Sequence, residues 1–382
     1  MIRWRYFFNS SQSSDDSSSS SESDDNLIDV ISAIAVAEGL QDRPKNEGFV
    51  ENIVPTYSDQ QFVEHFRVSR RIVHQLSVDF QESEYYAKTD KGFKRITSEK
   101  CILAFLWFAS NQTVSYRDVS DRFNLSLSTL YCVVQKVSRF LSDLAENVIV
   151  WPTREECQRL SEEFGRMGFP GAIACIDGTH IKLDTPSDDP DSYLNRKKYH
   201  SIQMQVVCDS NRKIRDVFIG FPGSVHDARV FRNSPLSHSI QEKCGDWFIL
   251  GDSAYPCLRN LLTPYKETEN LRNVHKNFNK KLSHCRVLIE HTIELLKQRF
   301  RQLYHVKFRK IESICHFIRA CCVLDNICVD ENVIEPAVDP EPTVEPNFED
   351  AGAQDPVYID IENERNEVGL NYRNYVAAML NV

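Results

Sequence analysis

The sequence predicts an α/β protein in which a mixed β-sheet is covered by helices and preceded by a helical region. Between residues 171 and 252, short apolar runs bounded by Gly, Asp or Asn predict four strands: GAIACID, IQMQVVCD, IRDVFIGF and DWFILGD. On either side of this stretch, apolar residues recur at helical spacing, which is typical of helices that cover a sheet. The chain has 382 residues, of which 41% are hydrophobic and 26% charged, so about two globular domains can form.

The two ends of the chain differ from the body in composition. Residues 1–48 contain a serine run among acidic residues and are predicted to be disordered, as a solubilising tail or a phosphorylation tract. Residues 330–368 repeat Pro and Glu and are predicted to form an extended acidic linker. Residues 369–382 are predicted to form a short C-terminal helix, because their apolar side chains recur at roughly helical spacing.

Residues 49–150 are predicted to form a helical domain, with Ser58 as the N-cap of an early helix. Within it, the segment 116–144 has the layout of a helix-turn-helix: a short helix, a tight turn and a longer helix. Its second helix would present Gln135 and Arg139 to the major groove of DNA. The alternative is an ordinary helical hairpin packed against the next domain, and the sequence leaves both interpretations open.

The net charge of −10 is unevenly distributed along the chain. Residues 1–25 carry −3 and residues 330–382 carry −11, so the body between them carries +4. Within the body, Lys266–Lys310 holds twelve basic residues against four acidic ones. This basic segment fits phosphate binding, and a solvated helix face is the alternative.

The twelve cysteines are scattered, form no CxxC pair and are expected to be reduced and buried. One group near the end of the body suggests zinc as an alternative: Cys315, Cys321, Cys322, Cys328, His305 and His316. Its spacing matches no common zinc module, so a cysteine-rich core helix is the preferred interpretation. No apolar run approaches the about 20 residues that span a bilayer, so no membrane partner is expected.

Two aspartates mark the candidate site. Asp177 and Asp252 are each expected at the end of a buried strand, beside Gly178 and Gly251. A carboxylate there is partly desolvated and needs a proton, a counter-charge or a metal ion. Glycine next to it allows close approach of backbone and ligand.

The third acid is expected from the basic helix SHCRVLIEHTIELLKQRFRQL. Its apolar residues step by four and three from Ile289 to Leu303 and predict one core face, which places Glu290 at the margin of the core. Three converging carboxylates repel one another, and Mg²⁺ or Mn²⁺, used in pairs to cut phosphodiesters, would resolve this. The neighbouring basic residues would hold the polyanion: Arg286, Lys297 and Arg301.

Four blocks carry a resemblance to a known family: AIACIDGTHIKL, the block from YHSIQMQVVCD to VFRNSPL, ILGDSAYPCLRNLLTPY and FNKKLSHCRVLIEHTIELLKQRFRQL. In order and spacing they resemble the catalytic blocks of the PIF/Harbinger transposase superfamily, and most of all those of the Harbinger transposase-derived nucleases domesticated in animals. The resemblance covers residues 173–303, and the helices before them resemble the family more loosely. It implies an RNase H-like fold for a nuclease domain at residues 151–329.

The resemblance also implies roles for single residues. Asp177 in DGTH, Asp252 in GDSAY and Glu290 in RVLIE match the family's DDE triad, whose acids hold the two metal ions that cut DNA. His226 and Asp227 match the family's HD block at the edge of the site. His180 matches as well, and a structural role is the preferred interpretation for this side chain.

The resemblance implies a metal-dependent endonuclease, a hydrolase acting on ester bonds in double-stranded DNA. The alternative is a domesticated DNA-binding or scaffold protein that has lost cleavage. Transposases of this family work with a Myb/SANT-like partner, which implies a nuclear location, with a cytoplasmic pool allowed. Because the chain shows no convincing basic localisation run, import is expected to depend on that partner. Homo-oligomerisation stays open.

Overall fold

The structure, a computed structural model, describes residues 46–87, 95–112, 114–186, 189–266, 271–333 and 359–381, with side chains of the last range described from Asn366 on. Of the serine-rich N-terminus predicted at 1–48, residues 1–45 lie outside the described residues. So does the predicted acidic linker between residues 334 and 358.

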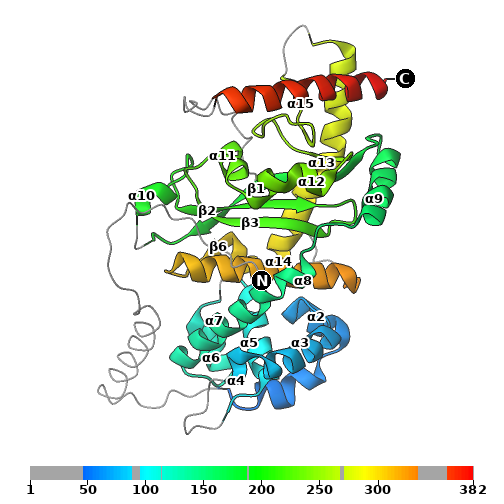
Figure 1. Cartoon of the computed structure of the whole chain (residues 1–382). Helices are drawn as coiled ribbons and strands as arrows, with labels where there is room; N and C mark the ends of the chain where they lie inside the picture. Colours follow the sequence, from blue (N-terminus) through cyan, green and yellow to red (C-terminus); the bar gives the residue numbers. More distant parts are fainter. Residues whose placement is uncertain are drawn as a thin grey trace. The chain divides into compact units, whose positions relative to one another are not determined.

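Six strands form one mixed sheet in the spatial order β3-β2-β1-β4-β5, and β6 pairs with β1 (Figure 1). Their bounds are β1 Ala172–Leu183, β2 Ser201–Cys208, β3 Ile214–Pro222, β4 Phe248–Leu250, β5 Leu261–Leu262 and β6 His305–Val306. The first three strands are antiparallel to one another, whereas β4, β5 and β6 join in parallel. The predicted mixed α/β class is therefore confirmed.

One sequence prediction about β1 is wrong. Asp177 was expected at the end of its strand, but β1 continues for six residues beyond it. The reason is pairing with β2, which runs without interruption from Cys175 opposite Cys208 to Lys182 opposite Ser201. Strand alternation then places Ile181 and Leu183 in the core, so the extension is held by packing as well as by hydrogen bonds.

The helices cover both faces of the sheet and extend beyond it. They are α2 Asp59–Phe66, α3 Arg70–Glu82, α4 Glu84–Ala87, α5 Ser98–Ser110, α6 Tyr116–Arg122, α7 Leu127–Asp143, α8 Ala145–Val148, α9 Arg154–Arg166, α10 Pro190–Tyr193, α11 Asp227–Arg232, α12 Pro235–Cys244, α13 Asn273–Arg299, α14 Ile311–Asp330 and α15 Ile359–Met379. Short helical turns lie at Phe49–Ile53, Val54–Thr56 and Arg301–Tyr304. Ser58 caps α2, as predicted, through a bond from the Gln61 amide.

Two hydrophobic clusters lie on opposite faces of the sheet. Side chains of α13 and α14 join Cys175, Ile181 and the alternate residues of β2 in the larger cluster. Side chains of α9, α11 and α12 join Ala174, Ile176 and Val207 in the smaller one. Because successive strand residues point to opposite faces, residues 175 and 176 belong to different clusters. The sheet is thus buried on both sides.

The predicted helix-turn-helix segment forms α6 and α7, joined by a turn with Asn124 at φ 50°. The longer helix, α7, packs against α5 and α14, and α14 in turn packs against β3 (Figure 1). Phe105 of α5 and Phe317 of α14 belong to the same cluster as the sheet residues. The N-terminal helices therefore share a core with one face of the sheet, and an independent domain at 49–150 stays a prediction.

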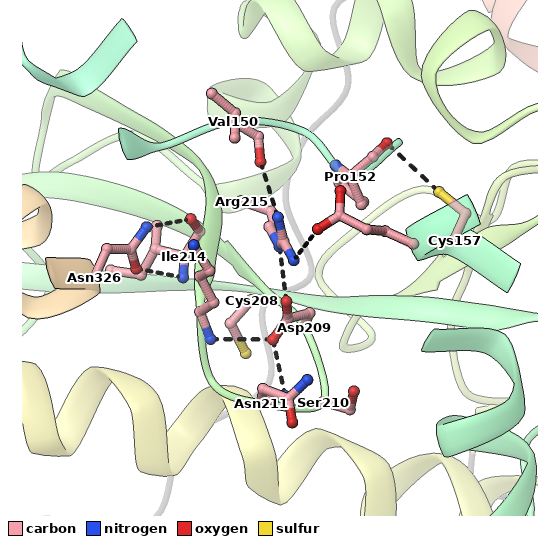
Figure 2. A network of polar contacts seen from close by, with 12 residues as sticks. Val150, Pro152, Cys157, Cys208, Asp209, Ser210, Asn211, Ile214, Arg215 and Asn326 are labelled. Atoms are coloured by element: carbon pink, nitrogen blue, oxygen red, sulfur yellow. Dashed lines mark hydrogen bonds and ion pairs between the residues drawn. The ribbon is translucent and has the colours of Figure 1, made fainter. Parts of the chain in front are cut away.

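A buried polar network ties the β2–β3 turn to its surroundings (Figure 2). Arg215 Nε donates to Asp209 Oδ2 at 2.7 Å, and its Nη2 lies 3.4 Å from Glu156 Oε1 of α9. The Asn326 side chain of α14 bonds to both the amide and the carbonyl of Ile214. These contacts fix α9 and α14 to the same end of the sheet.

The C-terminal helix is longer than predicted. The extended linker was expected to reach residue 368, but α15 begins at Ile359, so residues 359–368 are helical. The helix packs against α13 and β5. Arg373 donates to the carbonyls of Thr263 and Pro264 and lies over the Tyr265 ring. These bonds and Tyr372, which contacts Phe248, dock the helix beside the end strand of the sheet.

Candidate active site

The candidate site lies along a stretch of β1 that pairs with β2 on one edge and with no described strand on the other. On the edge of β1 away from β2, β4 pairs with Ala172–Cys175 and β6 pairs with Lys182–Leu183. Between these contacts, the described strands leave the edge of β1 open. Asp177 lies in this stretch, and Asp252 follows the last residue of β4 by two positions. The split between β4 and β6 therefore brings the two predicted aspartates into one region.

Asp177 has one cationic partner. Arg286 Nη2 of α13 donates to Asp177 Oδ2 at 3.1 Å, and the Gly178 amide donates to Oδ1 at 2.9 Å. Burial, together with the Asp252 and Asp227 carboxylates, raises the pKa of Asp177 to about 7, although Arg286 and the Gly178 amide lower it. The side chain is 18% exposed, so the site keeps an approach from solvent.

Asp227 lies against Gly178, the residue that follows Asp177 on β1. It begins α11 on the opposite face of the sheet, and a methyl group on Gly178 would lie 2.5 Å from its Oδ1. The absence of a side chain at Gly178 thus lets this carboxylate approach β1. The close approach of a ligand expected at that glycine stays a prediction. Burial and the Asp252 charge raise the pKa of Asp227 to about 6.

Tyr255 is a site residue that the sequence analysis missed. Its side chain is only 4% exposed, and its hydroxyl has no hydrogen-bond partner among the described residues. Burial raises the pKa of Tyr255, and the charges of Asp227, Asp177 and Asp252 raise it further. A buried hydroxyl without a hydrogen-bond partner is rare in folded proteins, so Tyr255 is a candidate residue of the site. Its position three residues after Asp252, in GDSAY, was the available signal.

Glu290 approaches the aspartates only through Arg286. It lies one turn further along α13, where its Oε1 is 3.6 Å from Arg286 Nη2, and its side chain is 58% exposed. Asp177 and Glu290 therefore share one guanidinium. In the part of the chain that the structure describes, no three His, Cys, Asp or Glu side chains gather closely enough to hold a metal ion. The convergence expected from the sequence is thus incomplete in this arrangement.

The chemistry of the donors nevertheless fits a divalent cation. The candidate ligands are carboxylate oxygens, which Mg²⁺ and Mn²⁺ prefer. The raised pKa values of Asp177 and Asp227 show that their negative charges are under-compensated, since Arg286 is the cation that contacts Asp177. Asp177, Asp252 and Glu290 are the residues that would hold the metal, with Asp227 beside them.

Basic and histidine side chains border the acids. Lys297 Nζ donates to Thr179 Oγ1 at 2.8 Å and to the His180 carbonyl at 3.3 Å, at the open edge of β1. His180 Nδ1 lies 3.1 Å from Ser201 Oγ, and burial, Lys297 and Lys197 lower the pKa of His180 to about 4. This neutral, hydrogen-bonded ring agrees with the structural role preferred for it.

The other residues predicted for the site or for DNA binding have contacts of their own. His226 immediately precedes α11, and its ring contacts Arg196. Arg301 follows α13, and its Nη2 donates to Gln298 Oε1 at 3.1 Å. Gln135 and Arg139 are half-buried on α7, where Gln135 Nε2 is buried without a hydrogen-bond partner. Since α14 packs between α7 and β3, these two residues do not belong to the site on β1.

The cysteines form no second centre. All twelve are free, and all but Cys132 are buried, as expected. Cys315, Cys321, Cys322 and Cys328 are core residues of α14, and the described residues hold no metal-binding group with them. The zinc alternative is therefore not supported.

Comparison with known proteins identifies the family. A family model described as DDE superfamily endonuclease matches residues 176–326. Putative nuclease HARBI1 of Mus musculus is 32% identical over 246 residues, covering 63% of this chain and 70% of that protein. The chain belongs to the DDE superfamily endonucleases of the PIF/Harbinger type.

Other members and a solved structure complete the comparison with this DDE family. Protein ALP1-like of Arabidopsis thaliana is 25% identical over 310 residues, 74% of each chain. The cryo-EM structure of a piggyBac transposase synaptic complex with hairpin DNA aligns at 10% identity and a TM-score of 0.31, over 86% of this chain and 82% of that one. A score this low carries no argument about the fold. Among the described residues, no helix is long and apolar enough to cross a membrane.

Proposed function

We propose that this chain is a metal-dependent endonuclease that hydrolyses phosphodiester bonds of double-stranded DNA by a two-metal mechanism. The observation that carries the proposal is the group of half-buried carboxylates at the open edge of β1, where Arg286 is the cation in contact with Asp177 among the described residues. Several partly desolvated carboxylates close together with so little compensation are typical of a functional site. Family membership supports the same chemistry.

The residues divide the work as follows. Bound Mg²⁺ or Mn²⁺ would supply the charge that activates a water and stabilises the leaving oxygen. Asp177, Asp252 and Glu290 would hold the cations, and the rigid β1 backbone fixes Asp177 in place. Arg286 orients the Asp177 and Glu290 carboxylates through Nη2. Lys297, tied to the open edge of β1, places positive charge where the DNA backbone would approach.

Plasmid cleavage tests the proposal. The full chain is incubated with supercoiled plasmid and Mg²⁺ or Mn²⁺, beside Asp177→Asn and Glu290→Gln. Both variants should cleave at least about 100-fold more slowly, because the transition state loses several kcal/mol of metal-mediated stabilisation. Lys213→Ala, which removes a cation paired with Asp330 far along the sequence from the acids, is the control that keeps activity. Equal cleavage by wild type and both acid variants would reject the proposal.

A second candidate is a catalytically silent DNA-binding or scaffold protein. The observation that favours it is the pairing of Arg286 with both Asp177 and Glu290, together with the lack of a preformed three-ligand group among the described residues. In that case the Arg286 guanidinium stands where the metal ion would bind, and no metal ion binds. Thermal melting distinguishes the two: the nuclease gains stability with Mn²⁺ in the millimolar range, whereas the silent protein does not.

The cellular setting forms part of the same proposal. A Myb/SANT-like DNA-binding partner would bring the chain to the nucleus and to its DNA targets. Localisation of the tagged chain, with and without such a partner expressed in the same cell, tests this. Nuclear accumulation that does not change with the partner would contradict the dependence on it.

A further inference from the structure

A short turn between α10 and β2 presents three consecutive cations near the acids. Arg196, Lys197 and Lys198 are exposed and follow the buried Asn195. The turn is closed by backbone bonds from the Asn195 amide to the Tyr199 carbonyl, at 3.0 Å, and from the Lys198 amide to the Asn195 carbonyl, at 2.9 Å. These two bonds give the turn a defined backbone conformation.

Side-chain bonds anchor this turn to the strand that carries Asp177. Asn195 Nδ2 donates to Ser201 Oγ at 3.0 Å, and the same oxygen lies 3.1 Å from His180 Nδ1 of β1. His180 is three residues beyond Asp177 on the same strand. The Asn195 side chain thus fixes the three cations to the part of β1 that leads away from the acids.

The turn also reaches the element that carries Asp227. Arg196 Nη2 lies 2.8 Å from His226 Nε2, and His226 directly precedes α11. On the other side of the strand, Lys297 Nζ contacts Thr179 and the His180 carbonyl. Lys197 and Lys297 both lower the pKa of His180, which places both charges close to that ring.

The described acidic residues of the same connection are Asp184, Asp189 and Asp191. Asp184 Oδ1 is 2.8 Å from His305 Nε2, so its charge is directed to another partner. Asp189 accepts a hydrogen bond from Ser192 at the start of α10, and Asp191 lies on α10 itself. Residues 196–198 at the tip of the turn are all basic and exposed.

We propose that the turn Asn195–Lys198 is a binding site for backbone phosphates of DNA, next to the bond that the acids would cut. Arg196 and Lys197 are the phosphate contacts, and Asn195 is the positioning residue that holds them. The inference rests on the proposed function for the choice of DNA as the polyanion. Contacts of this kind fix the strand in register and carry no sequence preference.

Salt-dependent DNA binding tests the site without cleavage. Fluorescence anisotropy follows a labelled DNA duplex bound to the full chain in EDTA, between 50 and 200 mM salt. Each lost phosphate contact lowers the slope of log affinity against log salt by about 0.9. Arg196→Ala/Lys197→Ala should thus lower it by about 1.8, which makes the affinity lost relative to wild type about 12-fold larger at 50 than at 200 mM salt.

A matched variant and a milder one keep the test sharp. Arg154→Ala/Arg159→Ala removes two exposed cations from α9, which packs near the first residues of β1, and should leave the slope unchanged. Lys197→Ala alone, which spares the contact of Arg196 with His226, should lower the slope by about 0.9. Equal slopes for the turn variants and the α9 variant would overturn the inference, as would a wild type that does not bind DNA.

The outcome is separable from that of the proposed function. If the wild type binds DNA with the predicted slope change but never cleaves with Mg²⁺ or Mn²⁺, the phosphate site stands and the nuclease proposal fails. If the wild type cleaves and the turn variants bind with an unchanged slope, the nuclease proposal stands and the phosphate site is wrong.

Discussion

Acidic side chains lie at two kinds of place in this molecule, fully buried at one and half-buried at the other, and the two differ in how their charge is compensated. The paired acids, Asp209 and Asp325, are 1% and 5% exposed, and each contacts an arginine, with N to O distances of 2.7 and 2.8 Å. Arg215, the partner of Asp209, also contacts Glu156 at 3.4 Å. The site acids, Asp177, Asp227 and Asp252, lie near one another at the open edge of β1. Among them Asp177 contacts Arg286 at 3.1 Å, and that guanidinium is shared with Glu290.

This difference indicates that the paired acids stabilise the fold, whereas the site acids serve a chemical function. Asp325 and Arg299 join α14 to the end of α13, and Arg299 Nη1 also donates to the Arg67 carbonyl. Removing either charge leaves the other buried without its opposite charge. The site acids instead repel one another, and burial raises the pKa of Asp177 and of Asp227 above its ordinary value. A bound cation would offset the repulsion among these carboxylates, so the group favours cation binding.

The largest expected effect breaks a paired acid. Asp325→Ala should lower the free energy of unfolding by about 3–5 kcal/mol, because Arg299 stays buried and unpaired. Asp330→Ala is the control on the same helix: its pair with Lys213 is exposed and is worth less than about 1 kcal/mol. Urea denaturation measures both. A similar loss of unfolding free energy in the two variants would show that the buried pair stabilises the fold no more than the exposed pair does.

The opposite sign is expected for a site acid. In EDTA at pH 7, Asp177→Asn should raise the free energy of unfolding by about 1 kcal/mol, since the amide removes a charge that burial and two neighbouring carboxylates disfavour. Asp209→Asn should lower it by about 1–3 kcal/mol, because the carboxylate accepts bonds from Arg215 and from two backbone amides. Equal destabilisation by both would remove the distinction between the two kinds of acid.

Protonation of His180 gives a pH-dependent loss of stability of about 2 kcal/mol between pH 7 and pH 5. The folded pKa of about 4 lies below the unfolded value of 6.5, so between these values the unfolded state binds a proton that the folded state does not. Stability is therefore complete above about pH 6.5 and falls as the pH drops toward 4. His180→Gln should lose less stability than wild type between pH 7 and pH 5, measured by denaturation at each pH. Parallel pH profiles would contradict the buried, neutral ring.

The smallest effect concerns the unpartnered hydroxyl in the site. Tyr255→Phe should change the free energy of unfolding by less than about 0.5 kcal/mol, because the hydroxyl has no hydrogen-bond partner to lose among the described residues. Tyr265→Phe is the comparison: it loses the bond to Asn374 Oδ1 at 2.7 Å and should cost about 1 kcal/mol. Thermal melting resolves the two, and a larger loss at Tyr255 would mean that its hydroxyl has a partner.

Local patterns predicted much of the fold. The core face from Ile289 to Leu303 is buried as its spacing predicted, and α6 and α7 form where the helix-turn-helix pattern placed them. The strands β5 and β6 have two residues each, too short for a periodic signal, and they exist through pairing with β4 and β1. The continuation of β1 beyond Asp177 likewise depends on β2, which a local reading cannot supply.

The site was predicted in part for the same reason. Family blocks pointed to Asp177, Asp252 and Glu290, but the pairing of Arg286 with two of them depends on how α13 lies on the sheet. The approach of Asp227 over Gly178 needs the position of α11 on the opposite face. The phosphate turn needs Asn195 and His180, 15 positions apart, to meet at Ser201. Such relations arise from tertiary packing, not from spacing along the chain.

Titration with Mn²⁺ tests the central claim most directly, because it measures whether the site acids bind the cation that their charges call for. Electron paramagnetic resonance follows free Mn²⁺ as it is added to the wild type, to Asp177→Asn and to Asp330→Asn. The account predicts saturable binding by the wild type, the same binding by Asp330→Asn, and its loss in Asp177→Asn. Equal binding by all three proteins, or none by the wild type, would contradict it.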